Sequence, residues 1–242
     1  MKALKNLFQF RGELHDIYLL NFSVDAREIA GRLPSPIRPA LQQGRALISM
    51  VDVHLRNMQP EKPRLPFKFH YQHVAFRLLI EDAQWNDDGR EHGIFFLDSF
   101  TDRPFLAWAG NLFSEFHYQV GRIANYPSGL RLDAGNKFVE YQLVGPEQHV
   151  DDRLRNLQTR IGAIDRAWAL VDNRLQKTQI VREHWPLEAM HCTQFETNFF
   201  ETARFEGAFR VTEAIHYQWL RPEVVKTLSA EAMWNPSALS HA

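Results

Sequence analysis

Short runs of alternating apolar and polar residues recur along the chain and predict β-strands. In residues 46–55 apolar residues alternate through Leu47, Val51, Val53 and Leu55, while the opposite face carries Ile48, Met50, Asp52 and His54, which predicts a half-buried strand. Similar runs predict further strands at residues 14–22, 74–80, 94–99, 116–124, 137–144, 178–184, 188–195 and 213–220. Strands are therefore the main elements of the chain.

Two short helices are expected among these strands. Asp25 can cap a helix, Glu28 can reach back to reinforce that cap, and Pro34 marks the helix's end. Pro104 suits the first turn of a second helix over residues 104–113, where apolar residues gather on one side. A further helical patch is expected near residues 198–204.

The strongest helical pattern lies at residues 148–168, where apolar residues recur at spacings of three and four. The spacing extends to Leu175, so the segment is either one long helix or a helix followed by a strand. This amphipathic face could form the seam of a coiled-coil dimer or cover the core of its own domain. Gly162 is a poor seam residue, which favours the core helix.

The predicted strands are separated mostly by turns rather than by crossover helices. This arrangement is typical of an antiparallel sheet that curls or closes on itself, in an α+β, mainly antiparallel β fold with a few peripheral helices. No composition shift, repeat or low-complexity stretch divides the chain. The sequence therefore predicts a single domain over residues 1–242.

Composition narrows the choice of partners. The 28 basic and 29 acidic residues nearly cancel, and no basic run with interleaved aromatic residues occurs, so nucleic acid is not an expected partner. No run of about 18 apolar residues occurs, which argues against a membrane span. The single cysteine, Cys192, leaves no internal disulfide, and this favours a cytoplasmic protein.

No motif for a metal or a cofactor is found. The eleven histidines include no His-Glu-x-x-His pair, and neither a glycine-rich dinucleotide motif nor a phosphate-binding loop is present. His70 and His73 fall on opposite faces of a strand, so they are not expected to share a ligand. The sequence therefore predicts neither metal nor cofactor.

Several segments together resemble a known family. Residues 93–99 (GIFFLDS) and 106–113 (LAWAGNLF) are similar to the centre of the YqjF-like family of uncharacterised conserved bacterial proteins, within the acetoacetate decarboxylase-like superfamily. The flanks that agree are residues 14–34, 74–80, 184–187 and 216–217, together with Asn198. The resemblance implies an acetoacetate decarboxylase-like cone or barrel of antiparallel strands with a central pocket.

The resemblance also bears on chemistry. In acetoacetate decarboxylase a lysine, made acidic by a neighbouring lysine, forms a Schiff base with a keto acid. When this sequence is aligned with that motif, Tyr118 and Gln119 stand in the places of the two lysines. The sequence holds no lysine between Lys68 and Lys137. His73 lies nearest the place of an acidic pocket residue. The resemblance therefore implies the pocket without the imine.

Residues 105–122 are expected to wall this pocket. The candidate pocket residues are Tyr118, His117, His73, Glu115, Arg122 and Trp108. They suit the binding of an unknown small organic molecule. An enzyme that acts on a carbonyl compound by general acid/base catalysis is the first alternative, and a protein-interaction domain that uses the 148–168 helix is the second. A homo-oligomer is possible with any of them.

Overall fold

The computed structural model describes residues 9–62, 66–114 and 116–228. Its strands, which join one 15-stranded sheet, are β1 (Phe10–Asp25), β2 (Leu41–Gln42), β3 (Arg45–Pro60), β4 (Phe69–Leu79), β5 (Gly93–Thr101), β6 (Tyr118–Val120), β7 (Arg122–Tyr126), β8 (Gly129–Ala134), β9 (Lys137–Pro146), β10 (Arg166–Val171), β11 (Arg174–Arg182), β12 (Leu187–Thr197), β13 (Arg204–Val211), β14 (Ile215–Trp219) and β15 (Glu223–Thr227). The helices are α1 (Ala26–Ala30), α2 (Pro104–Phe113), α3 (Asp152–Gly162) and the 3₁₀ turn η2 (Ala83–Trp85).

Part of the sheet closes into a barrel. The strands β3, β4, β5, β10, β11, β14 and β1 follow one another by hydrogen bonding, and β1 pairs again with β3 to complete the ring. All pairings are antiparallel except those of β5 with β10 and with β6. This confirms the prediction of a mainly antiparallel α+β barrel. That residues 1–242 form a single domain stays a prediction.

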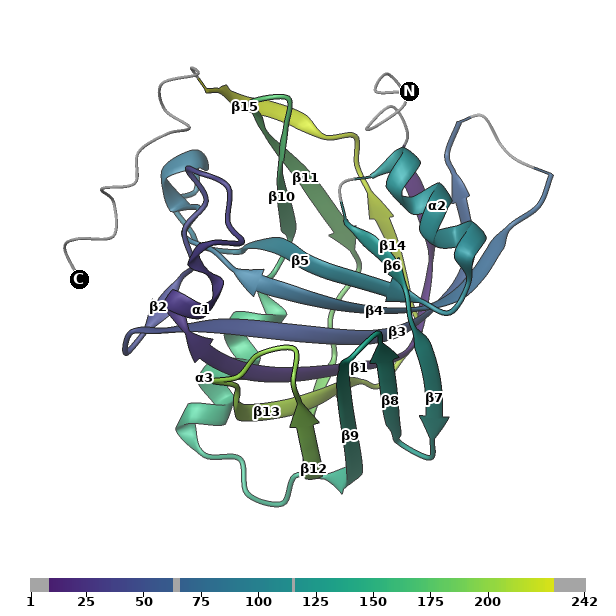
Figure 1. The fold of residues 1–242 in the computed structure, drawn as a ribbon, viewed down its shortest axis with the longest axis vertical. Helices are drawn as coiled ribbons and strands as arrows, with labels where there is room; N and C mark the ends of the chain where they lie inside the picture. The colour runs from purple at the N-terminus through teal and green to yellow at the C-terminus, as the bar shows by residue number, and fades with distance from the viewer. Residues whose placement is uncertain (1–8, 63–65, 115, 229–242) are drawn as a thin grey trace.

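The long strand β1 belongs to two layers. Its first half pairs with β14 in the barrel, and its second half pairs with β13, from which β12, β9, β8 and β7 continue the sheet (Figure 1). One hydrophobic cluster fills the barrel interior and the other lies between the barrel wall and this second layer. The barrel wall therefore separates two cores.

Strand β3 shows the consequence, because both its faces are buried. Ile48 and Met50 belong to the cluster between the layers, whereas Leu47 and Val51 face the barrel interior. The prediction of a half-buried strand is wrong here, since the second layer covers the face that Asp52 shares. Asp52 is buried there with its carboxylate accepting hydrogen bonds from Tyr141 and Gln72.

Helices α1 and α2 begin where the sequence predicts. The Asp25 side chain accepts a hydrogen bond from the Arg27 backbone and caps α1, and Pro104 opens α2. The prediction that the Glu28 side chain bonds back to the N-terminal cap of α1 is wrong. Its carboxylate instead accepts hydrogen bonds from the backbone N–H groups of Glu201 and Thr202. Those contacts hold residues 198–203 in turns, so the helix expected at 198–204 is absent from this described segment.

The predicted helix at 148–168 is too long. α3 spans Asp152–Gly162, and the chain then forms β10, whose Trp168 faces the cluster between the layers. The helical spacing of Trp168 is thus coincidental, and a helix followed by a strand is the correct alternative. Leu157 and Ile161 are buried from α3, which packs on β12 and β13. Its apolar face therefore covers the chain's own core.

The strand predicted at 116–124 is interrupted. Gly121 separates β6, which pairs with β5, from β7, which pairs with β8. A Cβ at Gly121 would lie 2.6 Å from the Leu132 side chain, so a larger residue here would have to displace that buried leucine. The predicted alignment of Tyr118 with Arg122 on one face is therefore wrong. Strand β8, at Gly129–Ala134, was not predicted.

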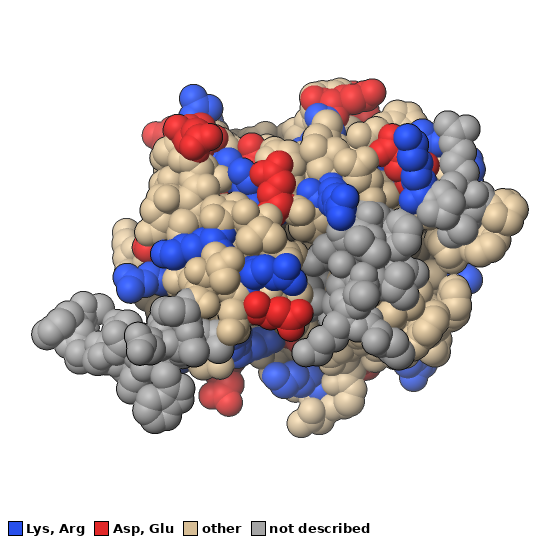
Figure 2. Space-filling model, turned by 90° about the horizontal axis from the view of Figure 1, so that it is seen from above, with Lys and Arg blue, Asp and Glu red and all other residues tan. Residues whose placement is uncertain are grey.

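Surface charge is mixed on the side seen in Figure 2, where basic and acidic side chains are interspersed. No helix among the described residues is long and apolar enough to cross a membrane.

Candidate functional site

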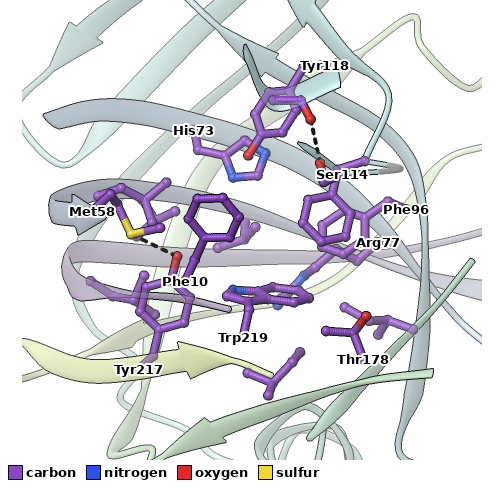
Figure 3. Close-up of a pocket in the computed structure, with 18 of the residues that line it drawn as sticks. Phe10, Met58, His73, Arg77, Phe96, Ser114, Tyr118, Thr178, Tyr217 and Trp219 are labelled. Atoms are coloured by element: carbon purple, nitrogen blue, oxygen red, sulfur yellow. Dashed lines mark hydrogen bonds between the residues drawn. The ribbon is translucent and has the colours of Figure 1, made fainter. Parts of the chain in front are cut away.

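A cavity of about 310 Å³ lies inside the barrel (Figure 3). Its walls come from all seven strands of the ring and from α2, which contributes Leu106, Ala109 and Gly110. Most of the lining is apolar. In Figure 3, Tyr118 and His73 lie together on one side of the cavity, with Trp219, Tyr217 and Thr178 on the opposite side.

Two residues of helix α2, Gly110 and Asn111, hold Tyr118 in place. The Asn111 side chain donates to the Tyr118 carbonyl at 2.7 Å and accepts from the Tyr118 N–H at 2.8 Å. The Tyr118 ring lies so close to Gly110 that a Cβ there would sit 2.4 Å from a ring carbon. The Gly110-Asn111 pair thus explains how an irregular segment directs one aromatic side chain into the cavity.

Three polar side chains meet at this end of the cavity. The hydroxyls of Tyr71 and Tyr118 lie 3.4 Å apart, and the His73 ring stacks on Tyr118 with centroids separated by 4.8 Å. Burial raises the pKa of both phenols and lowers the pKa of His73 to about 3, with a further contribution from the Arg77 charge. His73 is therefore a neutral imidazole at physiological pH.

The neutral imidazole also has free hydrogen-bonding capacity. The Nε2 atom of His73 is buried and has no hydrogen-bond partner among the described residues. One of the two hydroxyls, Tyr71 or Tyr118, can donate its proton to the other, and the second hydroxyl can then donate its own proton to a ligand. The group Tyr71, His73 and Tyr118, the neutral polar group, can therefore both donate and accept a hydrogen bond at the cavity surface.

Two arginines line the same cavity. Arg77, on β4, is 9% exposed and donates to the backbone and hydroxyl oxygens of Ser49. Arg182, at the end of β11, donates to the Gly162 carbonyl and lies 4.6 Å over the Trp185 ring. Neither makes an ion pair with a described carboxylate.

The electrostatics of the two guanidiniums are linked. Burial and the nearby charge of Arg182 lower the pKa of Arg77 to about 9, and burial lowers the pKa of Arg182 to about 10, partly offset by Asp165. Both side chains still carry a charge at pH 7. The cavity therefore contains positive charge and, among its described lining residues, no aspartate or glutamate.

Aromatic rings form much of the wall between these groups. Phe116 lies 4.4 Å from Phe96 and 4.8 Å from Trp219, measured between ring centroids, and all three line the cavity. A flat apolar group packs on such a wall better than a polar one.

A second, more polar hollow adjoins the cavity. Arg182 and Tyr217 line both spaces, and the Tyr217 hydroxyl donates to the Met58 sulfur at 3.2 Å. These two side chains therefore form part of the wall between the hollows.

The candidate residues from the sequence separate into two sets. His73 and Tyr118 line the cavity, whereas His117, Arg122 and Trp108 are exposed and do not line it. Glu115 lies outside the described residues. His117 has a left-handed backbone conformation, with φ of 53°, and Arg122 lies beyond the break at Gly121. The functional roles of all six stay predictions.

Arg77, Arg182 and Tyr71 were missed as candidates. A signal for Arg77 was available, because an arginine inside the apolar run at 74–80 is unlike the usual exposed arginine. Strand alternation from His73 then places Arg77 on the same face. Among the described residues no group of three or more His, Cys, Asp or Glu side chains could hold a metal ion.

Comparison with known proteins agrees with this architecture. Residues 11–219 match DUF2071, described as an uncharacterized conserved protein family. Acetoacetate decarboxylase from Legionella pneumophila superposes with a TM-score of 0.58 at 12% identity, over 90% of this chain and 87% of that one. An acetoacetate decarboxylase-like enzyme from Sphingomonas wittichii gives 0.54 at 10% identity, over 91% and 94%. No functionally curated protein matches the chain.

A third similar structure is the enduracididine biosynthesis enzyme MppR complexed with pyruvate, with a TM-score of 0.54 at 11% identity, over 92% of this chain and 91% of that one. At such identities the likeness shows the fold alone. The expected membership of a family of uncharacterised conserved proteins is confirmed, and so is the acetoacetate decarboxylase-like fold.

Proposed function

The chain belongs to the DUF2071 family of uncharacterized conserved proteins, and we propose that its barrel cavity binds a small organic acid without Schiff-base chemistry. The supporting observation is that Arg77 and Arg182 line one cavity whose described lining holds no acidic side chain. A buried charge without a counterion is costly. A carboxylate ligand would supply that counterion and could accept paired hydrogen bonds from a guanidinium.

The rest of the lining supports an apolar body for this acid. The cavity volume, about 310 Å³, is at the lower end of the range of about 300–1,000 Å³ found for small-molecule sites. The similar structures include an acetoacetate decarboxylase and MppR with pyruvate bound, and both names refer to small organic acids.

The absence of imine chemistry rests on the lining residues. A Schiff base needs an amine, and none of the described residues that line the cavity is a lysine. Lys177 is on β11 but lies outside the lining, where it pairs with Glu223. Tyr118 and Gln119 stand where the resemblance places the lysine pair.

The binding proposal is tested by calorimetry with 3-phenylpropionate as the probe. We expect saturable binding by the full chain, and at least a tenfold weaker Kd for Arg77→Met and Arg182→Met, because each removes one charge from the carboxylate site. The matched control is Arg122→Met, which removes an exposed arginine outside the cavity. Unmeasurable binding, or equal Kd values in all four proteins, would reject the proposal.

Schiff-base chemistry is tested separately by trapping. The chain is incubated with pyruvate or acetoacetate and sodium borohydride, then weighed by mass spectrometry. A protein without an imine keeps its mass, whereas one reduced adduct that maps to a single lysine would contradict this part of the proposal.

General acid/base catalysis on a carbonyl compound is the second candidate function. The observation behind it is the Tyr118 phenol, which can donate a proton to a carbonyl oxygen, beside the His73 Nε2, which can accept a hydrogen bond from the substrate. Its test is exchange of α-protons of a ketone in D₂O, followed by NMR. Exchange that persists unchanged in Tyr118→Phe and His73→Ala would exclude these roles.

The interaction-domain hypothesis receives less support. The apolar face of α3 is occupied by β12 and β13, where the Leu154 and Leu157 side chains pack over Gly207. Leu157→Glu is therefore expected to unfold the chain rather than to dissociate an assembly. Homo-oligomer formation stays a prediction, to be measured by equilibrium sedimentation.

A further inference from the structure

We propose that the ligand of the cavity has two heads: a carboxylate held by the arginines, and an uncharged oxygen at the far end of an aryl body held by the neutral polar group. This inference rests on the proposed function and names the class of acid that the same cavity selects. The class is aryl carboxylic acids that carry a hydroxyl on the ring, remote from the carboxylate.

The two polar ends are spaced along one strand. The register of β4 against β3 is regular from His73, opposite Val53, to Arg77, opposite Ser49. His73 and Arg77 are therefore on the same face of β4, four residues apart, which separates their Cα atoms by about 13 Å. A compact acid bound at Arg77 leaves the neutral polar group without a partner, whereas an elongated acid reaches both.

The region between the two ends is apolar and aromatic. Val51 and Val53 line it from β3, and three further lining residues, Phe96, Phe116 and Trp219, contribute rings in mutual contact. Rings with centroids 4.4 to 5.9 Å apart form walls on which a planar ligand ring can pack. This favours an aryl spacer over a branched aliphatic one.

The neutral polar group selects an uncharged oxygen. The deficit at His73 Nε2 is filled by a ligand hydroxyl that donates to it, while the free phenol proton of the Tyr71–Tyr118 pair is donated to the same ligand oxygen. No described acidic side chain lines this end to neutralise a ligand cation. A second carboxylate there would bring its own desolvation cost with no arginine to offset it.

The test compares two probes, 3-(4-hydroxyphenyl)propionate and 3-phenylpropionate, which differ only in the ring hydroxyl. We expect the full chain to bind the hydroxylated acid about fivefold to tenfold more tightly, the gain of about one additional net hydrogen bond. In Tyr118→Phe and in His73→Phe the ratio of the two Kd values falls toward one. The control Tyr126→Phe, at an exposed tyrosine of β7, keeps the wild-type ratio.

The outcomes separate the two proposals. If both acids bind and lose affinity in Arg77→Met, but the hydroxyl adds nothing, the two-headed ligand is wrong and the anion site stands. If the ratio of the two Kd values in Tyr118→Phe equals that of wild type, the inference is also overturned, because the ligand hydroxyl then binds to other groups. If neither acid binds, both proposals fail together.

Discussion

The imidazole of His73 stacks on the phenol ring of Tyr118, with ring centroids 4.8 Å apart and planes 28° from parallel. The stack joins β4 to the segment after α2, and the two meet because β5 pairs with β4 on one side and with β6 on the other. It leaves His73 7% exposed, so the ring cannot be protonated without desolvating a charge.

A pH dependence of stability follows from this burial. The pKa of His73 is lowered from 6.5 in the unfolded chain to about 3 in the folded one, so its contribution is present above pH 6.5 and is lost as pH falls. We expect wild type to lose stability relative to His73→Gln by up to about 1.4 kcal/mol per pH unit below pH 6. Urea unfolding between pH 7 and pH 4 measures the difference.

The control for this prediction is His184→Gln, since His184 is an exposed histidine outside the cavity. Its unfolding free energy should run parallel to that of wild type across the pH range. If His73→Gln also runs parallel, the folded protein admits the proton, and the neutral state of His73 is wrong.

Sequence alone predicted the parts of the fold that local chemistry specifies. Proline at the first turn placed α2 correctly, and the Asp25 cap placed the start of α1. The errors arose where contacts with distant segments determine whether a stretch forms a helix or a strand. Trp168 kept helical spacing with α3, yet it pairs in β10 because parallel contact with β5 is available only in the closed barrel.

For the same reason, only two of the sequence candidates line the cavity, and whether any of them has a functional role stays a prediction. Tyr118 and His73 followed from the resemblance, but the direction of a side chain after Gly121 depends on packing against Leu132 of β8, a strand that was not predicted. Arg77 was overlooked although it interrupts the apolar run at 74–80, because its burial follows from barrel closure around β4 and one strand's sequence does not show which of its faces will be enclosed.

The buried carboxyl of Asp52 lies on the other side of the barrel wall from the cavity. Asp52 accepts hydrogen bonds from the Tyr141 hydroxyl at 2.6 Å and from Gln72 at 2.7 Å, while burial raises its pKa. Tyr141→Phe should destabilise the protein by about 1.5–3 kcal/mol at pH 7, because the buried carboxylate loses a donor. Tyr126→Phe, at an exposed tyrosine, should change stability little.

The pH dependence of that cost distinguishes the hydrogen bond from simple packing. A raised folded-state pKa means that the folded protein favours the protonated carboxyl more than the unfolded chain does, so this contribution to stability is fully present below pH 3.8 and is lost as pH rises through the folded-state pKa. The cost of Tyr141→Phe should therefore shrink toward pH 3.8. An equal cost at both pH values would indicate a packing defect instead.

The contact of Glu28 with the 198–203 turns predicts a third effect. Its carboxylate accepts from the backbone N–H groups of Glu201 and Thr202, next to the buried Phe200. We expect Glu28→Ala to destabilise the chain by about 1–3 kcal/mol, since two donors lose a charged acceptor. Asp152→Ala, which removes a carboxylate that is 98% exposed, serves as control in thermal denaturation. Equal shifts in Tm for both variants would reject the role of Glu28.

Gly110 connects the stability of α2 to the position of Tyr118. A Cβ there would lie 2.4 Å from the Tyr118 ring, and that ring cannot yield cheaply because Asn111 holds the Tyr118 backbone and His73 stacks on the ring. Gly110→Ala should therefore cost about 1–3 kcal/mol of stability and also lower the preference for a hydroxylated aryl acid.

Gly31→Ala is the matched control, because nothing lies within 4 Å of its Cβ and its φ of −71° suits alanine, so it should be neutral or stabilising by about 0.4–1 kcal/mol. Were the two variants equally stable, the Tyr118 ring would be free to move, and a fixed phenol could not be what selects the ligand.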